Sequence, residues 1–247
     1  MAIVELRANS LRVVRSRDGV TQVLPVEDSL QGVVRAAPEA LLGRKIIVCE
    51  GKTEVGICRA LDRWWTSADL EQFGYLGVVP VDGGGSAQAP QRAMQLRTLG
   101  YDVLYLGDSD APMNPDAATL RAAGIQVILW ANNMALEERI AADLPWDGMR
   151  EVVTYAVSLY GRQSVDGVIS SQLGAAAPAG EIGTWPETPQ LRTAIGLAAK
   201  SANRSGWFKR IELAEGLGDI ACRFIQNVPG TDFATKVAGL RQWIDRE

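Results

Sequence analysis

Short apolar runs alternate with longer amphipathic stretches through the middle of the chain. Four such runs, rich in Ile, Val and Leu, predict buried strands at residues 45–49, 77–81, 103–106 and 125–130. Helices are predicted at residues 53–66, 87–99 and 115–123, with another after Asn132 and Asn133, where Asn can cap a first turn. Alternating strands and helices indicate an α/β fold, with a parallel sheet flanked by helices.

The two ends of the chain lack this alternation. Residues 1–40 predict two short strands, at 11–14 and 21–24, and then a helix toward residue 40. Because this segment has too few apolar residues for a core of its own, we interpret it as a linker or the tail of an upstream domain. Residues 151–247 predict a small helical subdomain with a Gly/Ala/Pro-rich loop near residues 174–189. Residues 41–150 then form the α/β domain.

Composition adds limits on location and on cysteine chemistry. The hydrophobic content of 47% is ample for a packed core. No apolar run approaches the length of about 18 residues that a membrane span requires, and no secretory signal is evident, so we predict a cytoplasmic protein without a membrane partner. Cys49, Cys58 and Cys222 are odd in number and widely spaced, which favours buried thiols over disulfides or a zinc site.

The chain contains no histidine. This excludes a Ser-His-Asp triad and a His-ligated zinc centre, so carboxylates and lysines must carry any chemistry. A net charge of −4 argues against a broadly basic nucleic-acid binder. A site of several carboxylates is still compatible with nucleic acid, because bound metal ions reverse the local charge.

Carboxylates cluster where two of the predicted strands end. Glu50 ends the first strand, and Glu54 falls in the first turn of the next helix. Asp108 and Asp110 follow the third strand and, being two residues apart, would point the same way. Ligands of such sheets bind beyond the strand ends, and hard oxygens suit Mg²⁺ or Mn²⁺. The alternatives are a helix-dipole role for Glu54 and an ordinary turn for the Asp pair.

The second strand ends in the Gly-rich segment DGGGSAQAP, residues 82–90. Its spacing fits neither a phosphate loop nor a dinucleotide motif. We therefore expect a tight strand-to-helix turn that leaves room for a substrate backbone.

Taken in order, VCEGKTE at residues 48–54, the Gly-rich turn and GDSD at residues 107–110 resemble the Toprim domain. This domain is shared by topoisomerases, bacterial primases, small RNases and nucleases of the OLD (overcoming lysogenization defect) family. The form of the first motif and the later GWFK, residues 206–209, resemble the OLD nucleases most closely. The resemblance covers residues 41 to about 215 and makes 41–150 a Toprim catalytic domain.

The resemblance implies two bound Mg²⁺ or Mn²⁺ ions and assigns ligands to them. The expected metal ligands are Glu50, Glu54, Asp108 and Asp110. A further acidic ligand is expected downstream, at Glu137 in preference to Glu138, although an exposed glutamate pair on a helix is usually only a solvated face.

The family also uses a lysine, which we assign to Lys209, beside Trp207 and Phe208. Its ammonium would stabilise phosphate charge; the alternatives are a surface lysine beside core aromatics, or Lys200 in that role. Basic residues would grip the nucleic-acid backbone, and the candidates are Lys200, Arg204 and Arg210.

The function predicted is DNA cleavage by two-metal phosphodiester hydrolysis, with Lys209, Glu50 and Asp108 as catalytic residues. DNA as substrate, a role in phage defence and an ATPase domain upstream come from the OLD resemblance; the chain itself has no Walker motif. The alternatives are an RNA-directed or primase-like Toprim enzyme and a non-catalytic, metal-binding interaction module.

Overall fold

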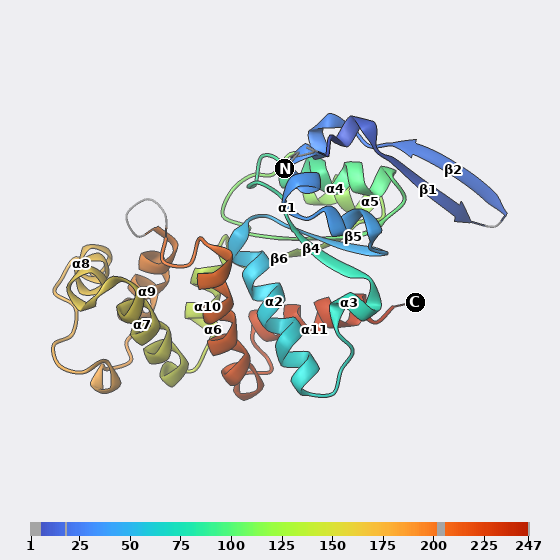
Figure 1. The fold of residues 1–247 in the computed structure, drawn as a ribbon. Helices are drawn as coiled ribbons and strands as arrows, with labels where there is room; N and C mark the ends of the chain where they lie inside the picture. Colours follow the sequence, from blue (N-terminus) through green and yellow to red (C-terminus); the bar gives the residue numbers. More distant parts are fainter. Residues whose placement is uncertain (1–5, 18, 202–205, 247) are drawn as a thin grey trace, which may run out of the picture. The chain divides into compact units, whose positions relative to one another are not determined.

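The four apolar runs form one sheet in the computed structural model (Figure 1), which describes residues 6–17, 19–201 and 206–246. The strands are β3 (Lys45–Cys49), β4 (Val78–Asp82), β5 (Asp102–Gly107) and β6 (Gln126–Leu129), in the order β4-β3-β5-β6. β3 pairs in parallel with both β4 and β5, and all of its residues are buried. The predicted α/β class, a parallel sheet flanked by helices, is confirmed.

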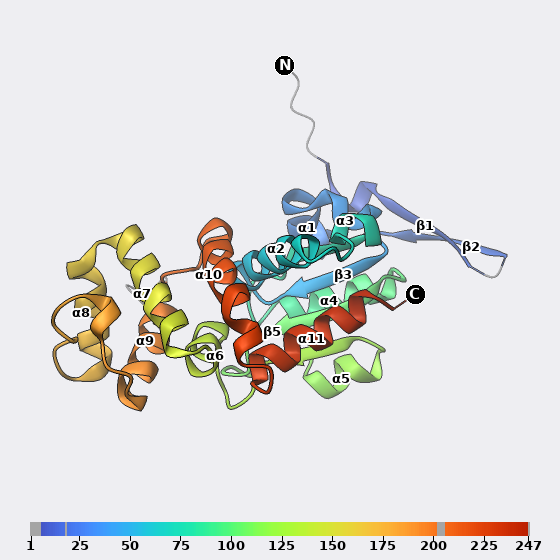
Figure 2. The same ribbon diagram turned by 90° about the horizontal axis from the view of Figure 1, so that it is seen from below.

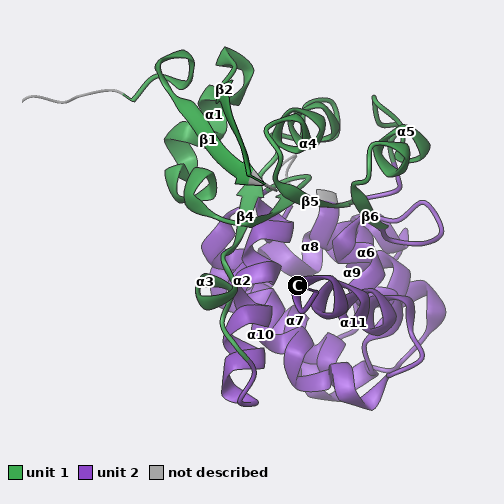
Figure 3. Cartoon of the chain, turned by 90° about the vertical axis from the view of Figure 1, so that its right-hand side faces the viewer, with its two compact units in different colours: residues 1–51, 71–107, 111–128 green, residues 52–70, 108–110, 129–247 purple. Residues whose placement is uncertain are grey.

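The chain divides into two compact units, which Figure 3 colours separately. Unit 1 comprises residues 1–51, 71–107 and 111–128, and unit 2 comprises residues 52–70, 108–110 and 129–247. Both units take segments from the predicted α/β domain. The boundaries predicted at residues 40 and 150 stay predictions.

Unit 1 contains the sheet and an antiparallel hairpin that extends away from it (Figure 2). In the hairpin, Val14 of one strand faces Val23 of the other. α4 packs against β3 and β5, and α1 packs against β4. The remaining elements of this unit are β1 (Arg12–Arg17), β2 (Val20–Pro25), α1 (Gln31–Ala36), α3 (Phe73–Leu76), α4 (Ala89–Thr98) and α5 (Ala117–Ala122).

The Gly-rich segment after β4 forms the tight turn that the sequence predicts. The Gly83 amide donates to the Cys49 carbonyl at 2.8 Å, and the Gly85 amide donates to the Glu50 carbonyl at 2.8 Å. A Cβ atom on Gly83 would lie 2.5 Å from that Cys49 oxygen, so a side chain is excluded there. The turn therefore ties the ends of β3 and β4 together.

The described part of unit 2 is built from helices and loops. Its helices are α2 (Lys52–Ser67), α6 (Leu136–Asp143), α7 (Trp146–Tyr160), α8 (Arg162–Leu173), α9 (Pro189–Ser201), α10 (Ile211–Phe224) and α11 (Asp232–Ile244). The predicted loop lies between α8 and α9 and contains one 3-10 turn, Ile182–Thr184. No helix in the described ranges is both long enough and apolar enough to cross a membrane. The three cysteines are buried, as predicted.

The predicted Asn cap of the helix after residue 133 is wrong. Asn132 and Asn133 have φ angles of 65° and 54°, and α6 begins later, with Ala135 as its N-cap residue. The Glu138 side chain accepts a hydrogen bond from the Ala135 amide at 3.0 Å. Both Asn residues instead supply the left-handed backbone that this loop requires, a conformation Asn tolerates better than most residues.

Two glycines allow α2 and α10 to pack in close contact within unit 2. A Cβ atom on Gly56 would lie 2.5 Å from both the Ala214 Cβ and the Ile211 carbonyl oxygen. A Cβ atom on Gly218 would lie 2.5 Å from the Ala60 Cβ. This approach holds the first turn of α2 beside the segment that precedes α10.

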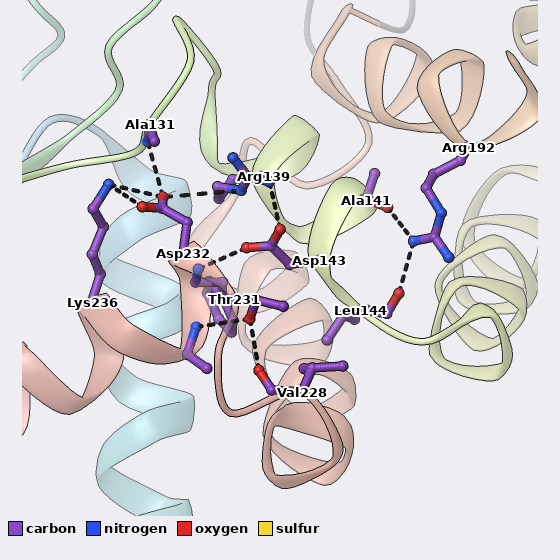
Figure 4. A network of polar contacts seen from close by, with 12 residues as sticks. Ala131, Arg139, Ala141, Asp143, Leu144, Arg192, Val228, Thr231, Asp232 and Lys236 are labelled. Atoms are coloured by element: carbon purple, nitrogen blue, oxygen red, sulfur yellow. Dashed lines mark hydrogen bonds and ion pairs between the residues drawn. The ribbon is translucent and has the colours of Figure 1, made fainter. Parts of the chain in front are cut away.

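A polar network fixes α6 from its other end (Figure 4). Arg139 and Asp143 pair at 2.5 Å, and Asp143 also accepts the Phe233 amide at 2.7 Å. Asp232 accepts the Ala131 amide at 2.9 Å and pairs with Lys236. The network therefore joins α6 to the start of α11 through charged hydrogen bonds, which are stronger than neutral ones.

Candidate metal centre

Glu137, in the first turn of α6, carries a fully buried carboxylate. Its side chain is 0% exposed, and its Oε1 atom accepts the Lys209 ammonium at 2.7 Å and the Thr53 hydroxyl at 3.4 Å. Its Oε2 atom is buried and makes no hydrogen bond within the described ranges. A buried anionic oxygen without a donor is costly. A divalent cation, which prefers hard oxygen ligands, fits this position.

Lys209 follows two buried aromatic residues that fix its backbone. The Phe208 ring stacks on Tyr155 at 5.6 Å between centroids, and the Tyr160 hydroxyl donates to the Trp207 carbonyl at 2.7 Å. The Lys209 side chain is 40% exposed. Burial opposes its charge, but the anionic Glu137, Glu54 and Asp108 outweigh that effect and raise its pKa. Lys209 therefore stays charged among these three carboxylates.

The first turn of α2 contributes Thr53 and Glu54, which are buried to 2% and 3% exposure. The Thr53 hydroxyl is within 3.4 Å of both the Glu137 carboxylate and the Phe208 carbonyl oxygen. A glutamate that only complemented the helix dipole would normally remain solvated. The burial of Glu54 therefore favours a role inside the site.

Asp108 and Asp110 turn to different partners. Asp108 Oδ1 accepts the Leu136 amide at 2.8 Å, at the start of α6. Ser109 is bound to Met134 twice, through its amide and its hydroxyl. Asp110 Oδ2 instead pairs with the Lys200 ammonium at 2.7 Å. The Asp-x-Asp segment is thus fastened to the entry of α6, and Asp108 is the member near Lys209.

Lys200, in the last turn of α9, bridges Asp110 and Glu138, with the Glu138 contact at 2.8 Å. Burial opposes its charge, but the hydrogen bonds to Asp110 and Glu138 prevail and raise its pKa. The Glu138 carboxylate is therefore paired with Lys200 and is partly exposed. Of the two candidate glutamates, Glu137 is the one whose carboxylate is buried beside Lys209.

Glu50 lies in unit 1, at the end of β3. Its amide donates to the Leu106 carbonyl at 2.8 Å, and its Oε2 atom accepts the Tyr105 hydroxyl at 3.3 Å. Tyr105 is 0% exposed and was missed by sequence reasoning. The available signal was a tyrosine within a buried apolar strand, because its hydroxyl needs a polar partner.

The predicted backbone-binding residues differ in their surroundings. Arg210 is the N-cap residue of α10, with a 74% exposed side chain 3.7 Å from Glu212. Such an exposed pair is weak and leaves the guanidinium accessible to phosphate. Lys200 is engaged by two carboxylates, and Arg204 lies outside the described residues.

The described ranges contain no group of three or more Cys, Asp or Glu side chains arranged to hold a metal ion. The carboxylates of Glu137, Asp110 and Glu138 are instead paired with lysine side chains. Lys209 pairs with Glu137, and Lys200 pairs with Asp110 and Glu138.

The sequence matches no protein-family model and no curated protein. The structure is similar to the C-terminal region of the Burkholderia pseudomallei OLD protein, with a TM-score of 0.43 and 17% sequence identity. The likeness covers 82% of this chain and 98% of that chain. Identity this low assigns no chemical role to any residue.

Proposed function

We propose that this chain carries a divalent-metal-dependent endonuclease site that hydrolyses DNA phosphodiesters. The observation that carries the proposal is the buried Glu137 carboxylate, whose Oε2 atom makes no hydrogen bond in the described ranges while Lys209 holds its Oε1 atom. The motif order from Glu50 to Asp110 supports the same reading. No histidine is available for acid-base work, which leaves metal-assisted hydrolysis as the natural chemistry.

The proposed ligands of Mg²⁺ or Mn²⁺ in unit 2 are Glu54, Asp108 and Glu137, and the sequence adds Asp110 and Glu50. Bound divalent ions would supply a nucleophilic water at neutral pH and neutralise charge on the leaving oxygen. Lys209 would stabilise negative charge that develops on the phosphate, because its raised pKa keeps it protonated. Thr53 would orient Glu137 by its hydroxyl contact.

DNA as substrate, an ATPase domain upstream, a role in phage defence and a cytoplasmic location are proposals that rest on the motif resemblance to the OLD nucleases. Arg210, with its exposed guanidinium, would contact the DNA backbone. The sequence adds Arg204 and Lys200 to this group. Such contacts would position the strand without reading its bases.

The first test is cleavage of supercoiled plasmid with Mg²⁺, Mn²⁺, Ca²⁺ or EDTA. We expect nicked or linear product with Mg²⁺ or Mn²⁺ only. Asp108→Asn and Lys209→Met should each lower the cleavage rate by about 100-fold or more, as loss of charge stabilisation does in other enzymes. Lys236→Met is the matched control, because Lys236 also pairs with an aspartate at 2.7 Å, but in the network of Figure 4.

Other outcomes would favour other functions. Cleavage that persists in folded Asp108→Asn would mean that the site is misplaced. Cleavage of RNA alone would support the RNA-directed or primase-like reading. Stabilisation by metal without cleavage of either nucleic acid would support a non-catalytic metal-binding module.

A further inference from the structure

One cation of the site is already supplied by the chain at Asp110. The Lys200 ammonium lies 2.7 Å from Asp110 Oδ2 and 2.8 Å from Glu138 Oε2. The three side chains are only 29%, 22% and 17% exposed, so water screens them less than it would a surface pair. Lys200 therefore acts as a fixed counterion for both carboxylates.

The two carboxylates that contact this ammonium are anchored differently. Glu138 Oε2 also accepts the Ala135 amide at 3.0 Å, which fixes it to the start of α6. Asp110 follows β5, and the neighbouring Ser109 is the residue that is hydrogen-bonded to Met134. Glu138 is thus held by a backbone amide as well as by the ammonium.

A metal ion at Asp110 and the ammonium in its present place would compete. Both would occupy the Asp110 Oδ2 atom at close range, and two like charges a few ångströms apart repel strongly where water is partly excluded. Binding of the metal therefore has to include the transfer of the ammonium away from Asp110.

We propose that Lys200 is an internal competitor for the metal, which holds Asp110 when no metal is bound and shifts to Glu138 alone when Asp110 becomes a ligand. This inference rests on the proposed metal site. Lys200 is then a residue that sets the metal affinity, and it takes no part in the reaction. A surplus charge that has to be moved makes metal binding weaker than the carboxylates alone would give.

The test is titration of the whole chain with Mn²⁺, followed by calorimetry or by the paramagnetic signal of the free ion. Lys200→Met should bind Mn²⁺ about tenfold more tightly or better than the wild type, since each tenfold corresponds to about 1.4 kcal/mol of removed repulsion. Lys200→Arg keeps the cation and should stay within about threefold of the wild type. Lys236→Met, at a similarly half-buried Lys-Asp pair, should leave the affinity unchanged.

Melting temperature gives a second readout that does not depend on activity. Lys200→Met should melt lower than the wild type in EDTA, because Asp110 and Glu138 lose their counterion, and should gain more on addition of Mn²⁺. Lys200→Gln replaces it if the Met variant does not fold.

Unchanged or weaker Mn²⁺ affinity in folded Lys200→Met or Lys200→Gln, while the wild type binds the metal, would overturn this inference alone. Loss of DNA binding without a change in metal affinity would do the same and would return Lys200 to the group of backbone contacts. Absence of saturable Mn²⁺ binding by the wild type would overturn the proposed function, and this inference with it.

Discussion

Glu137 and Glu138 are neighbours on one helix, yet their carboxylates meet different environments. Leu136 and Ile140 are 0% and 1% exposed, so the same face of α6 is buried in unit 2. Glu137 is carried inward with that face, whereas Glu138 stays at the rim and pairs with Lys200. Lys209 and Thr53 both contact its Oε1 atom.

This arrangement predicts the behaviour of Glu137→Gln. The free energy of unfolding of the variant in EDTA should lie within about 1 kcal/mol of the wild-type value. Lys209 is 40% exposed, so water still solvates it when its partner has no charge. We expect Mn²⁺ to raise the melting temperature of the wild type and to leave that of Glu137→Gln unchanged. Thermal denaturation with EDTA and with Mn²⁺ measures both effects.

The matched control is Glu212→Gln, since Glu212 is 72% exposed in the first turn of α10. It should keep the full response to Mn²⁺. An undiminished response in Glu137→Gln would remove Glu137 from the metal centre.

Sequence reasoning at the residue scale reached the carboxylates but not their partners. The expectation of an acidic ligand at Glu137 came from the motif resemblance, which rests on local sequence. The pairing of Lys200 with Asp110 joins residues 90 positions apart in sequence, and the contact of Thr53 with Phe208 spans 155. Contacts between such distant segments depend on how helices pack, which no local pattern encodes.

At the scale of elements, the close packing of α2 against α10 depends on Gly56 and Gly218. Gly56→Ala would place a methyl group 2.5 Å from a backbone oxygen and from the Ala214 Cβ, and backbone cannot move aside as a flexible side chain can. We expect the free energy of unfolding to fall by about 2 kcal/mol, since overpacking costs about 1–3 kcal/mol and outweighs the better helix propensity of Ala. Urea denaturation measures the change.

Gly167→Ala is the control for that substitution. Gly167 lies within α8, and a Cβ atom there meets nothing within 4 Å. Stability should rise by about 0.5–1 kcal/mol, because only the helix propensity changes. Equal effects at Gly56 and Gly167 would contradict the close packing of α2 on α10.

The elements themselves were largely predictable. β3 spans the residues expected, and β5 differs from the prediction by one residue at each end, because buried strands in a parallel sheet are near-continuous apolar runs. The start of α6 was missed because Asn is suited both to capping and to left-handed turns, and the loop geometry decided between them.

For the whole molecule, the polar network of Figure 4 links stability to pH. Burial alone would raise the pKa of Asp232, but the Ala131 amide and Lys236 outweigh it and lower the pKa. A lowered pKa means that the charged form stabilises the fold at pH values above its unfolded value, near 3.8. That contribution is lost as the pH falls through the folded pKa.

Asp232→Asn should therefore be less stable than the wild type at pH 7, by about 1 kcal/mol. The difference should shrink as the pH falls below 4, because the carboxyl of the unfolded wild type takes up a proton first and the folded one follows at lower pH. Urea denaturation at pH 7 and pH 3 tests this. Asp147→Asn, which removes a 79% exposed partner of Arg150, should change stability little at either pH.

The division into two units could not be predicted by dividing the sequence into consecutive segments, because each unit combines several separate segments. The sheet and the helix α2 that directly follows β3 belong to different units, and residues 108–110 belong with the helices although β5 belongs with the sheet. The pattern of apolar residues near residue 150 predicts where the strands end. It does not predict which segments share a core, because that depends on packing between distant parts of the chain.

Gly206 lies close to parts of both Lys200 and Lys209. Its φ angle is 67°, and a Cβ atom there would lie 2.8 Å from the Lys200 carbonyl oxygen and 2.9 Å from the Lys209 Cγ. The next residue, Trp207, donates its amide to the Ala199 carbonyl at 2.8 Å. The end of α9 and the segment that carries Lys209 thus meet where the backbone leaves no room for a side chain. Any side chain at Gly206 would push against the end of α9 and the Lys209 segment at once, so one substitution would disturb the positions of both lysines.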